Sequence, residues 1–386
     1  MSSENSKLNP VSQKTVQTAE GLSVSDRFLK RLSFTPSQTE ELFSLISEID
    51  AIKGQWRITN KLSPQLLSRL TISSLLTSAG SSNRIEGNKL SDEDVKELYS
   101  KMRIQKFKTR DQQEVAGYIE ILRVIFDEWK SISLSEATIL NLHKELLKYV
   151  EKDERHRGNY KFESNQVQAQ DENGKLLGVI FDPTPPFLVK KEMQELVEFT
   201  KESLDLKNMV EGRPVKHPLI ILTNFIFEFL AIHPFRDGNG RTSRLLTNLL
   251  LLQFGYEFTP VSSHEKYVEE NKADYYLALN AVQNTWKTEQ EDLYPFAIFL
   301  IKVIHKQAEQ ALRILTQEDT EKLLSDKQIE VWRFALQNPR FTKSKVVAAT
   351  NLNQRTVEQT LKKLVDMNKL EQQGQGRSTR YVLVEG

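Results

Sequence analysis

Residues 231–246, AIHPFRDGNGRTSRLL, place a histidine, an aspartate, an asparagine, glycines and arginines between strongly apolar flanks. The flanking segments, residues 219–232 and 245–254, are apolar nearly all round, a pattern typical of helices that lie inside a core rather than on its surface. The sequence therefore predicts two buried helices joined by a short polar turn. Packing on both sides would hold that turn rigid.

The polar turn has the chemistry of an anion site. Gly238 and Gly240 allow backbone conformations and close approaches that side chains would block, so successive amide N–H groups can point at one spot. That spot lies at the start of the second helix, where unpaired N–H groups and the helix dipole favour a phosphate. Arg241 and Arg244 are three residues apart and can face the same anion with their guanidinium forks. The expected guest is a polyphosphate.

Two further residues of the turn are reactive groups. Asp237 supplies a hard carboxylate suited to a magnesium ion that bridges phosphate oxygens. His233 supplies a base that can be neutral near pH 7. A metal-hydrolase site fits less well, because only one histidine and one carboxylate are local. The sequence also lacks the GxxxxGK[ST] pattern of a Walker phosphate loop.

Composition limits the class of protein. The 386 residues suffice for two or three domains. Because 53 Lys or Arg face 52 Asp or Glu, a surface for nucleic acid or membrane would have to be local. The absence of cysteine excludes disulfides, zinc-thiolate sites and thiol nucleophiles, which suits a cytoplasmic location. The sequence shows neither a signal-peptide pattern nor a membrane-spanning run, so no membrane contact is expected.

Apolar residues at three- and four-residue spacing predict a mainly α fold. The expected helices cover residues 37–54, 63–80, 91–103, 110–130, 134–150, 188–204, 216–232, 240–254, 265–284 and 291–315, and, after a charged stretch at 317–322, residues 325–337, 342–349 and 354–367. Residues 160–186 differ, because two extended runs flank an Asn-Gly pair, which predicts a β-hairpin. The predicted divisions are a flexible tail at 1–24, a helical region at 25–110, a catalytic core at 111–316 and a C-terminal domain at 317–386.

The turn resembles the motif of the Fic family, HxFx(D/E)GNGRxxR, at every specified position from His233 to Arg244. The likeness in layout extends over residues 60–300 and includes RGNYK at 157–161 before the hairpin. It implies a Fic-type helical bundle with a small β-hairpin flap. It also implies an enzyme that transfers AMP from ATP to a Ser, Thr or Tyr hydroxyl of a target protein and releases pyrophosphate.

The same resemblance implies a role for each residue of the turn. His233 would be the general base that takes the proton of the target hydroxyl, and Asp237 would hold Mg²⁺. Arg244 would reach the γ-phosphate of ATP. The remaining phosphate ligands would be Gly238, Asn239, Gly240 and Arg241.

The resemblance also gives the hairpin and a tyrosine pair possible roles. In similar proteins the hairpin is a flap that aligns an extended piece of the target by strand addition, although a purely structural hairpin would have the same pattern. The flap edge would consist of Gly178, Val179, Ile180 and Phe181. The sequence FDPTPP at 181–186 departs from the family's tyrosine and triple-proline pattern, so the choice of target does not carry over. Tyr275 and Tyr276 resemble an aromatic pair near the adenine in relatives, and plain packing explains them equally well.

Residues 82–87 resemble the family's inhibitory motif, (S/T)xxxE(G/N), with Ser82, Glu86 and Gly87 at the specified places. The resemblance implies that Glu86 pairs with Arg244 and leaves a bound nucleotide misaligned for attack. Because the motif precedes the turn in the same chain, the inhibition would act in cis. A second use of Glu86 stays open, namely as the base of a reverse reaction that removes AMP.

The C-terminal part has a different pattern. Residues 325–386 carry eleven Lys or Arg and six Asp or Glu, a local excess of five positive charges. Three helices followed by extended runs at 370–373 and 379–384 resemble a winged helix-turn-helix domain with a recognition helix at 354–367. Gln354, Arg355, Arg377 and Arg380 would then contact DNA. Such domains also dock proteins or dimerise, and this alternative stays open.

Three functions are therefore compatible with the sequence. The first is an autoinhibited protein adenylyltransferase with ATP and Mg²⁺ as ligands and a protein as target. The second is a nucleotide-sensing regulator that binds DNA, and the third is a phosphotransferase or another nucleotidyltransferase that uses the same pocket. Self-modification and a homodimer are left open.

Overall fold

In the computed structural model, the described residues are 24–59, 62–102, 106–165, 167–170, 176–204, 216–374 and 379–384. The tail predicted at 1–24 lies outside them except for its last residue. The chain divides into two compact units, one made of Met1–Lys53 with Ser68–Ala308 and the other of Gly54–Leu67 with Glu309–Gly386. The division at residue 309 falls inside one long helix, α13 (Tyr294–Lys322).

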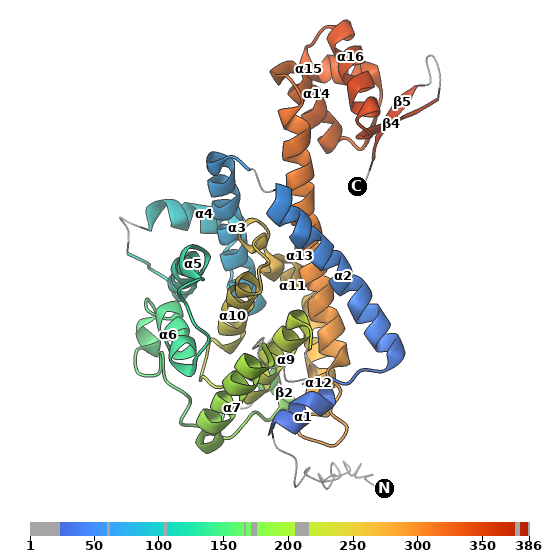
Figure 1. The fold of residues 1–386 in the computed structure, drawn as a ribbon. Helices are drawn as coiled ribbons and strands as arrows, with labels where there is room; N and C mark the ends of the chain where they lie inside the picture. Colours follow the sequence, from blue (N-terminus) through green and yellow to red (C-terminus); the bar gives the residue numbers. More distant parts are fainter. Residues whose placement is uncertain are drawn as a thin grey trace, which may run out of the picture. The chain divides into compact units, whose positions relative to one another are not determined.

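The described part of the first unit is helical apart from one β-hairpin (Figure 1). Its elements are α1 (Val24–Arg31), α2 (Pro36–Thr59) up to residue 53, α3 (Pro64–Ile85) from residue 68, α4 (Asp92–Lys101), α5 (Arg110–Glu128), α6 (Glu136–Leu146), η1 (Glu151–Asp153), β1 (Val167–Gln170), β2 (Leu176–Phe181), α7 (Pro186–Leu204), α9 (Pro218–Ile232), α10 (Asn239–Gln253), η2 (Thr259–Val261), α11 (His264–Glu270), α12 (Lys272–Gln283) and the first half of α13. The prediction of a mainly α fold with a small hairpin is confirmed.

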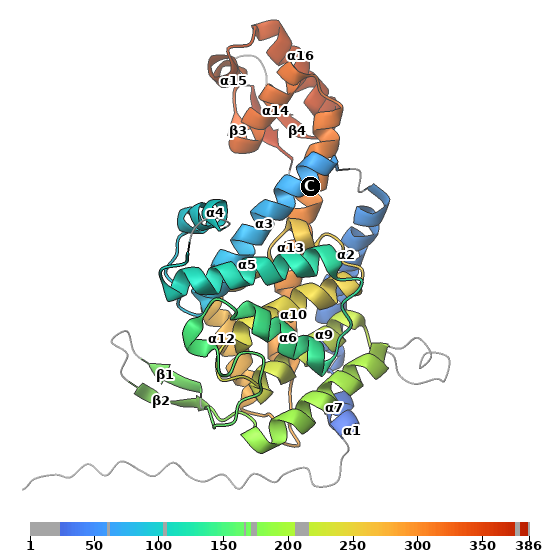
Figure 2. The same cartoon turned by 90° about the vertical axis from the view of Figure 1, so that its left-hand side faces the viewer.

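Two apolar helices, α9 and α10, form the centre of the first unit. Every residue of α9 from position 219 to 232 is buried, and so is every residue of α10 from 241 to 252. α9 packs against α7 and α10, whereas α10 packs against α5 and α6 (Figures 1 and 2). The predicted pair of buried helices joined by a polar turn is thus confirmed. The packing explains why that turn has little freedom to move.

A buried ion cluster fastens α1 onto α9. Glu228 lies within the apolar run of α9 and accepts hydrogen bonds from Arg27 and Arg31, each at 2.5 Å, and from the indole N–H of Trp286 at 3.0 Å. Burial alone would raise the pKa of Glu228, but the charges of Arg31 and Arg27 lower it to about 2. The carboxylate is therefore ionised inside the core, with α1 held in place by its partners.

The predicted hairpin is present as the antiparallel pair β1 and β2, which lies beside α12 (Figure 2). Val179 pairs with Gln168 and Gly178 with Ala169, while Ile180 falls where the register shifts before Phe181 pairs with Val167. At the end of β2, the ring of Phe181 packs against Trp286 with centroids 5.3 Å apart. The predicted turn at 171–174 and the side chains at 167–170 and 176–180 lie outside the described residues.

The second unit contains three short helices and a small sheet after α13. These are α14 (Asp326–Gln337), β3 (Arg340–Phe341), α15 (Lys343–Thr350), α16 (Gln354–Asp366), β4 (Leu370–Gln373) and β5 (Arg380–Leu383). The sheet order is β3-β5-β4, with both neighbouring pairs antiparallel. Val331, Trp332, Phe341 and Leu361 lie in its buried core. Residues 375–378, with the predicted contact Arg377, lie outside the described residues.

Two sequence predictions were wrong in detail. The helix expected at 265–284 is divided into α11 and α12, because Asn271 leaves the helical conformation with φ −118° and ψ 37°. The charged stretch at 317–322, expected to separate two parts, forms the last turns of α13. Gln, Glu and Lys are good helix formers, so a charged run of this kind extends a helix as readily as it ends one.

Within the described ranges, no helix is both long enough and apolar enough to span a membrane.

Candidate functional site

The predicted turn is a loop between α9 and α10 that its own side chains brace. His233 ends α9 in the left-handed region, with φ 52° and ψ 59°, and Gly238 follows in the same region with φ 80°. Asn239 spans the loop, because its Oδ1 accepts the N–H of Phe235 at 2.9 Å and its Nδ2 donates to the carbonyl of Phe235 at 2.8 Å. A left-handed residue other than glycine costs about 1–3 kcal/mol, so surrounding contacts must hold His233 in place.

The imidazole of His233 is set up as a neutral base. Its Nδ1 lies 3.4 Å from the carbonyl of Leu230, so a proton on Nδ1 points there and Nε2 carries the lone pair. Burial lowers the pKa of His233 to about 4, and the charge of Lys161 acts in the same direction, whereas Glu86 and Asp237 oppose them. The ring is therefore uncharged at pH 7, the state that can accept a proton from a hydroxyl.

Asp237 is surrounded by positive charge. Its Oδ1 accepts the N–H of Gly238 at 2.6 Å, and its Oδ2 accepts from Arg110 at 2.7 Å. Arg241 lies 3.2 Å from both oxygens and also 3.2 Å from Glu114. Burial would raise the pKa of Asp237, but Arg241 and the other donors lower it. The carboxylate is ionised, and two guanidinium groups already share it.

Arg244 contacts two residues at the end of α3. Its Nε donates to Ser82 Oγ at 2.8 Å, and its Nη2 donates to the Ser82 carbonyl at 2.9 Å and to Glu86 Oε1 at 2.7 Å. The Arg244 side chain is only 5% exposed, whereas that of Glu86 is 35% exposed. Nη1 of Arg244 is buried and has no hydrogen-bond partner among the described residues. The structure therefore brings Ser82 and Glu86 onto the arginine that the sequence singled out.

The carboxylate of Glu86 also lies over the start of α10. A Cβ at Gly240 would meet Glu86 Oε1 at 2.0 Å, so only a glycine leaves space for the acid there. Gly87, with φ 93°, turns the chain away directly after Glu86. The first turn of α10 has N–H groups without helical acceptors and the positive end of the dipole. The predicted anion site thus already faces a negative group from the same chain.

A buried carboxylate behind Arg244 ties α3 to its neighbours. Glu265, at the start of α11, accepts hydrogen bonds from Ser78 of α3 at 2.8 Å, Tyr118 of α5 at 3.0 Å and Asn248 of α10 at 2.6 Å. Because these donors come from three helices, the end of α3 that carries Glu86 is fixed relative to α10. No pattern in the sequence indicates this cluster, because its members are scattered along the chain.

Tyr275 and Tyr276 lie near the end of α3. Tyr275 is buried against the ring of Phe299, with centroids 5.7 Å apart, and Tyr276 is 44% exposed with its hydroxyl 3.5 Å from the carbonyl of Ile85. Burial raises the pKa of Tyr275 to about 12. Tyr276 is therefore the accessible member of the pair, and its hydroxyl contacts Ile85, the residue before Glu86.

His143 of α6 was not predicted from the sequence, yet it contacts the loop at Phe235 and Asp237. Its ring stacks on Phe235 with centroids 3.7 Å apart and an interplanar angle of 1°. Nδ1 accepts the N–H of Gly158 at 2.8 Å, so the proton is on Nε2, which donates to the carbonyl of Asp237 at 2.9 Å. Burial lowers the pKa of His143 to about 4. A single histidine on an amphipathic helix gives no signal of this in the sequence.

Lys161 and Asn165 were also missed as members of the site, although RGNYK was noted. The Lys161 backbone N–H donates to the carbonyl of Pro234 at 2.8 Å, and its Nζ donates to the carbonyl of Ile232 at 3.3 Å and to Asn165 Oδ1 at 2.7 Å. Asn165 Nδ2 donates to the carbonyl of Phe235 at 2.8 Å. The segment before the hairpin therefore contacts both sides of His233.

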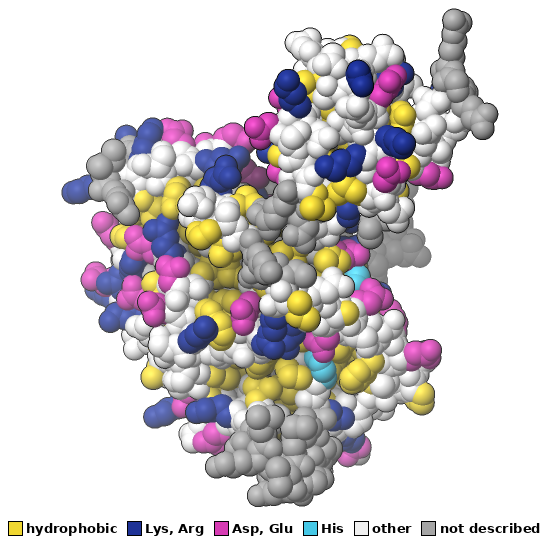
Figure 3. Space-filling view, turned by 45° about the horizontal axis from the view of Figure 1, so that its top comes forward, with side chains coloured by type: hydrophobic (Ala, Val, Ile, Leu, Met, Phe, Trp, Pro, Cys, Tyr) yellow, Lys and Arg dark blue, Asp and Glu magenta, His cyan; other side chains and the backbone are white. Residues whose placement is uncertain are grey.

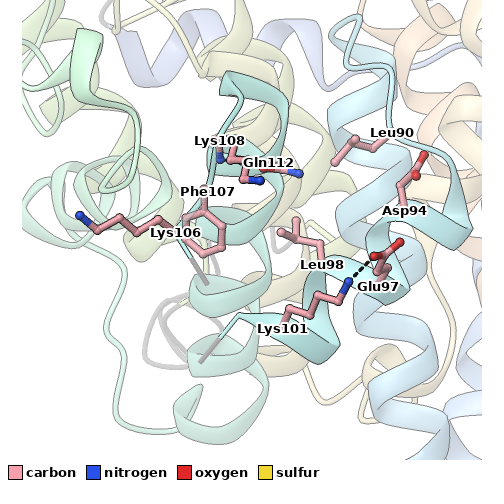
Figure 4. A pocket seen from close by; sticks show the side chains of 9 residues that line it. All are labelled: Leu90, Asp94, Glu97, Leu98, Lys101, Lys106, Phe107, Lys108 and Gln112. Carbon is pink, nitrogen blue, oxygen red and sulfur yellow. Dashed lines mark hydrogen bonds and ion pairs between the residues drawn. The ribbon is translucent and has the colours of Figure 1, made fainter. Parts of the chain in front are cut away.

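The protein alone offers few metal ligands. Among the described residues, no group of three or more His, Cys, Asp or Glu side chains is placed to hold a metal ion. A separate hollow lies between α4 and the start of α5, lined by Leu98, Lys101, Phe107 and Lys108 among others (Figure 4). None of the residues around this hollow belongs to the site predicted from the sequence.

Comparison with known proteins identifies the domain that carries the loop. The Fic/DOC family model matches residues 133–251. The chain is 29% identical over 225 residues to protein adenylyltransferase fic-1 of Caenorhabditis briggsae, covering 56% of this chain and 37% of that protein. It is 26% identical over 224 residues to protein adenylyltransferase Fic of Nematostella vectensis, covering 57% and 45% respectively. The chain thus spans less than half the length of these relatives.

The fold is also found in a solved structure. The crystal structure of a Fic family protein from Desulfovibrio desulfuricans G20 matches with a TM-score of 0.56 at 22% identity, covering 92% of this chain and 98% of that one. At this identity the likeness concerns the fold. With α9, the His233 loop and most of α10 inside the matched region, this chain contains a domain of the Fic/DOC family.

Proposed function

We propose that the protein is an autoinhibited adenylyltransferase that moves AMP from ATP to a Ser, Thr or Tyr hydroxyl of a target protein. One observation carries the proposal. The neutral imidazole of His233 shares a single braced loop with the start of α10, where Arg244 and the N–H groups of the first helical turn would bind an anion. Relatives named as protein adenylyltransferases support the same chemistry.

In the proposed reaction the target hydroxyl oxygen attacks the α-phosphorus of ATP. The new P–O bond forms as the bond to the β-phosphate breaks, the hydroxyl proton passes to Nε2 of His233, and pyrophosphate leaves. Base assistance of this kind contributes roughly 10²–10⁴-fold in rate. Asn239, Gly238, Gly240 and Arg241 would bind the phosphates, and Arg244 would take the γ-phosphate through its fork.

The residues fit a magnesium ion bound together with nucleotide. Mg²⁺ is commonly held by one or two carboxylates plus substrate phosphates rather than by an all-protein cage. Asp237 is an ionised oxygen donor with a 41% exposed side chain next to the anion site. Asp237 would hold the ion, whose chemistry would be neutralisation of phosphate charge. Binding would displace at least one of the two arginines that now share Asp237.

We further propose that Glu86 inhibits this reaction in cis. Its carboxylate occupies Nη2 of Arg244 and the space over Gly240, where a phosphate would otherwise sit. Nucleotide that enters beside it would be misaligned, and small misplacements of reacting atoms can cost about 10²-fold in rate. Ser82 would hold Arg244 in this arrangement, and Gly87 would end the helix. Glu86 as the base of an AMP-removing reaction is the alternative.

The hairpin would serve as a flap for the target. The edge formed by Gly178, Val179, Ile180 and Phe181 would pair with an extended segment of the target through backbone hydrogen bonds, which places few demands on sequence. Tyr275 and Tyr276 would line the adenine end of the nucleotide, next to Glu86.

Labelled ATP tests the proposal. The Glu86→Gly protein, incubated with Mg²⁺ and ATP labelled at the α-phosphorus, should retain label on itself or on a protein of a cell extract, and the mass gained should be that of AMP. His233→Ala in the same background should abolish the transfer while ATP still binds. Retention of a γ-label would instead identify a phosphotransferase. Release of AMP from labelled protein on adding wild type would identify the reverse reaction, and binding without any transfer would favour a regulator.

A second function is proposed for the second unit, namely binding of duplex DNA as a winged helix. The order of three helices and a three-stranded antiparallel sheet supports this, together with exposed Gln354 and Arg355 at the start of α16. Figure 3 shows Lys and Arg side chains on this unit interspersed with Asp and Glu. Binding that weakens steeply with added salt would support DNA contact, and salt-independent self-association would favour a docking role or a homodimer.

A cytoplasmic location of the protein stays a prediction.

A further inference from the structure

Three backbone carbonyls around His233 accept hydrogen bonds from three donors of one segment, and one of them, the carbonyl of Phe235, is shared with Asn239 of the loop itself. The carbonyl of Ile232 accepts from Lys161 Nζ, that of Pro234 from the Lys161 backbone N–H, and that of Phe235 from Asn165 Nδ2. Lys161 Nζ also donates to Asn165 Oδ1 at 2.7 Å, which links the two donors. The residues on both sides of His233 are therefore held from residues 161–165.

These hydrogen bonds help to hold His233 in an unfavourable backbone conformation. The residue lies in the left-handed region with φ 52°, which side chains other than glycine seldom adopt. Pro234 has no N–H and its ring fixes its own φ, so the carbonyls are the groups by which the loop can be held at this point. Lys161 is only 5% exposed, so its contacts face little competition from water.

We propose that Lys161 and Asn165 are positioning residues for the transfer: they hold the backbone on both sides of His233, and Lys161 also brings a positive charge close to its imidazole. The inference rests on the proposed role of His233 as base. Lys161 and Asn165 belong to the segment before the hairpin. The segment that leads into the proposed flap therefore also holds the backbone on both sides of His233, the proposed base.

The ammonium group of Lys161 acts on the pKa of His233 against two nearby carboxylates. Lys161 disfavours the protonated imidazole, while Glu86 from the end of α3 and Asp237 from the loop favour it. Burial lowers the pKa of Lys161 to about 8, with Asp182 and Glu192 acting against that and Lys287 with it, so Lys161 is charged at pH 7. Removal of the ammonium group leaves two carboxylates facing His233 and should make the ring easier to protonate.

Steady-state kinetics in the Glu86→Gly background test the positioning. Lys161→Met keeps the apolar stem but loses the Nζ donor and the charge, and Asn165→Asp keeps the shape but loses the donor to Phe235. Both should lower kcat about 10²-fold, while the Kd for ATP changes less than about threefold, because the phosphate site at residues 238–244 is held by other contacts. Asn159→Ala, in the same segment with its Nδ2 directed to Arg157, is the matched control and should leave kcat unchanged.

The pH dependence separates positioning from general structural damage. In Lys161→Met the acid limb of the kcat profile should move to higher pH by about one unit, whereas Lys161→Arg, which keeps the charge, should keep the wild-type limb. A uniform loss of rate with an unmoved limb, or a loss of ATP binding in parallel with kcat, would overturn the proposal.

A titration that needs no activity keeps this inference separate from the proposed function. NMR of ¹³C-labelled histidine, with His233→Ala to assign the signal among the six histidines, gives the pKa of His233 directly. It should rise in Lys161→Met relative to wild type and stay in Lys161→Arg. If the pKa rises but the Glu86→Gly protein transfers nothing, the positioning holds and the proposed function fails. If the pKa does not move, the role of Lys161 fails whatever the enzyme does.

Discussion

Two arginine–glutamate contacts involve the central helices α9 and α10 of the first unit, and they differ in how deeply the acid is buried. Glu228 is 1% exposed and shared by Arg27, Arg31 and the Trp286 indole. Glu86 is 35% exposed and faces Arg244 from the end of a helix. Removing the first acid would leave Arg31 buried beside only the more distant Glu291, whereas the second acid can turn into water while Arg244 keeps its hydrogen bonds to Ser82. The first contact is suited to holding a fold and the second to being exchanged.

The largest effect expected from this difference is on stability. Glu228→Gln should lower the free energy of unfolding by about 3–5 kcal/mol, because Arg31 would stay buried with only the more distant Glu291 for charge. Urea denaturation of the variant and of Glu86→Gln provides the measurement, and the latter should lose less, because Arg244 keeps its two hydrogen bonds to Ser82 and the partly exposed glutamine can still accept one. Equal losses in the two variants would remove the distinction between the contacts.

The pH dependence of stability tests whether the contacts of His143 with the His233 loop help to hold the fold, as the Glu228 contacts do. An imidazole in the unfolded chain takes up its proton near pH 6.5, whereas burial lowers the pKa of His143 in the folded state to about 4. The unfolded state therefore binds more protons between these values, so this contribution is full above pH 6.5 and is lost as pH falls toward 4. It amounts to roughly 3 kcal/mol.

His143→Phe, which keeps a ring to stack on Phe235, should lose that dependence. Unfolding midpoints of wild type and variant at pH 7, 6, 5 and 4 give the comparison, and the wild-type curve should fall more steeply. Parallel curves would mean that His143 is already protonated or exposed in the folded protein.

The exchangeable contact should control activity rather than stability. Glu86→Gly should raise AMP transfer by about 10²-fold, since Arg244 and the space over Gly240 become available to phosphate. Labelled-ATP assays measure this, with Glu93→Gly, another exposed acid on neighbouring α4, as the matched control. If wild type and the Glu86 variant label protein equally, Glu86 is not an inhibitor.

The smallest expected effect concerns Arg110, which holds Asp237 at 2.7 Å while 45% exposed. Arg110→Gln should lower the Mg²⁺ concentration for half-maximal ATP binding by about two- to fivefold, because one competitor for the carboxylate is gone and the contact is partly screened by water. Calorimetric titration of ATP at several Mg²⁺ concentrations detects this without turnover. Exposed Lys108→Gln is the control, and an unchanged Mg²⁺ requirement would show that Arg110 does not compete with the metal.

The central helices and the loop were predictable because their signals are local. Long apolar runs mark α9 and α10, and the polar and glycine residues between them are contiguous in the sequence. Short elements gave weaker patterns: α1 has eight residues and β3 has two, and α1 owes its place to Arg27 and Arg31 meeting Glu228, two hundred residues away in the chain.

The supporting residues of the site were not predictable for the same reason. His143, Lys161 and Asn165 act on loop carbonyls that are remote in sequence, and a hydrogen bond to a backbone oxygen leaves no pattern in the partner segment. Glu86 was predicted only because it belongs to a recognisable motif.

The absence of a side chain at Gly240 limits how the proposed inhibition by Glu86 can be lost through mutation. Any larger residue there would drive out the Glu86 oxygen, which lies 2.0 Å from where a Cβ would begin. It would equally fill the place that the proposed reaction gives to phosphate. If Glu86 inhibits as proposed, mutation of Gly240 would not release the activity, and release would have to come from Glu86 itself or from the helix that presents it.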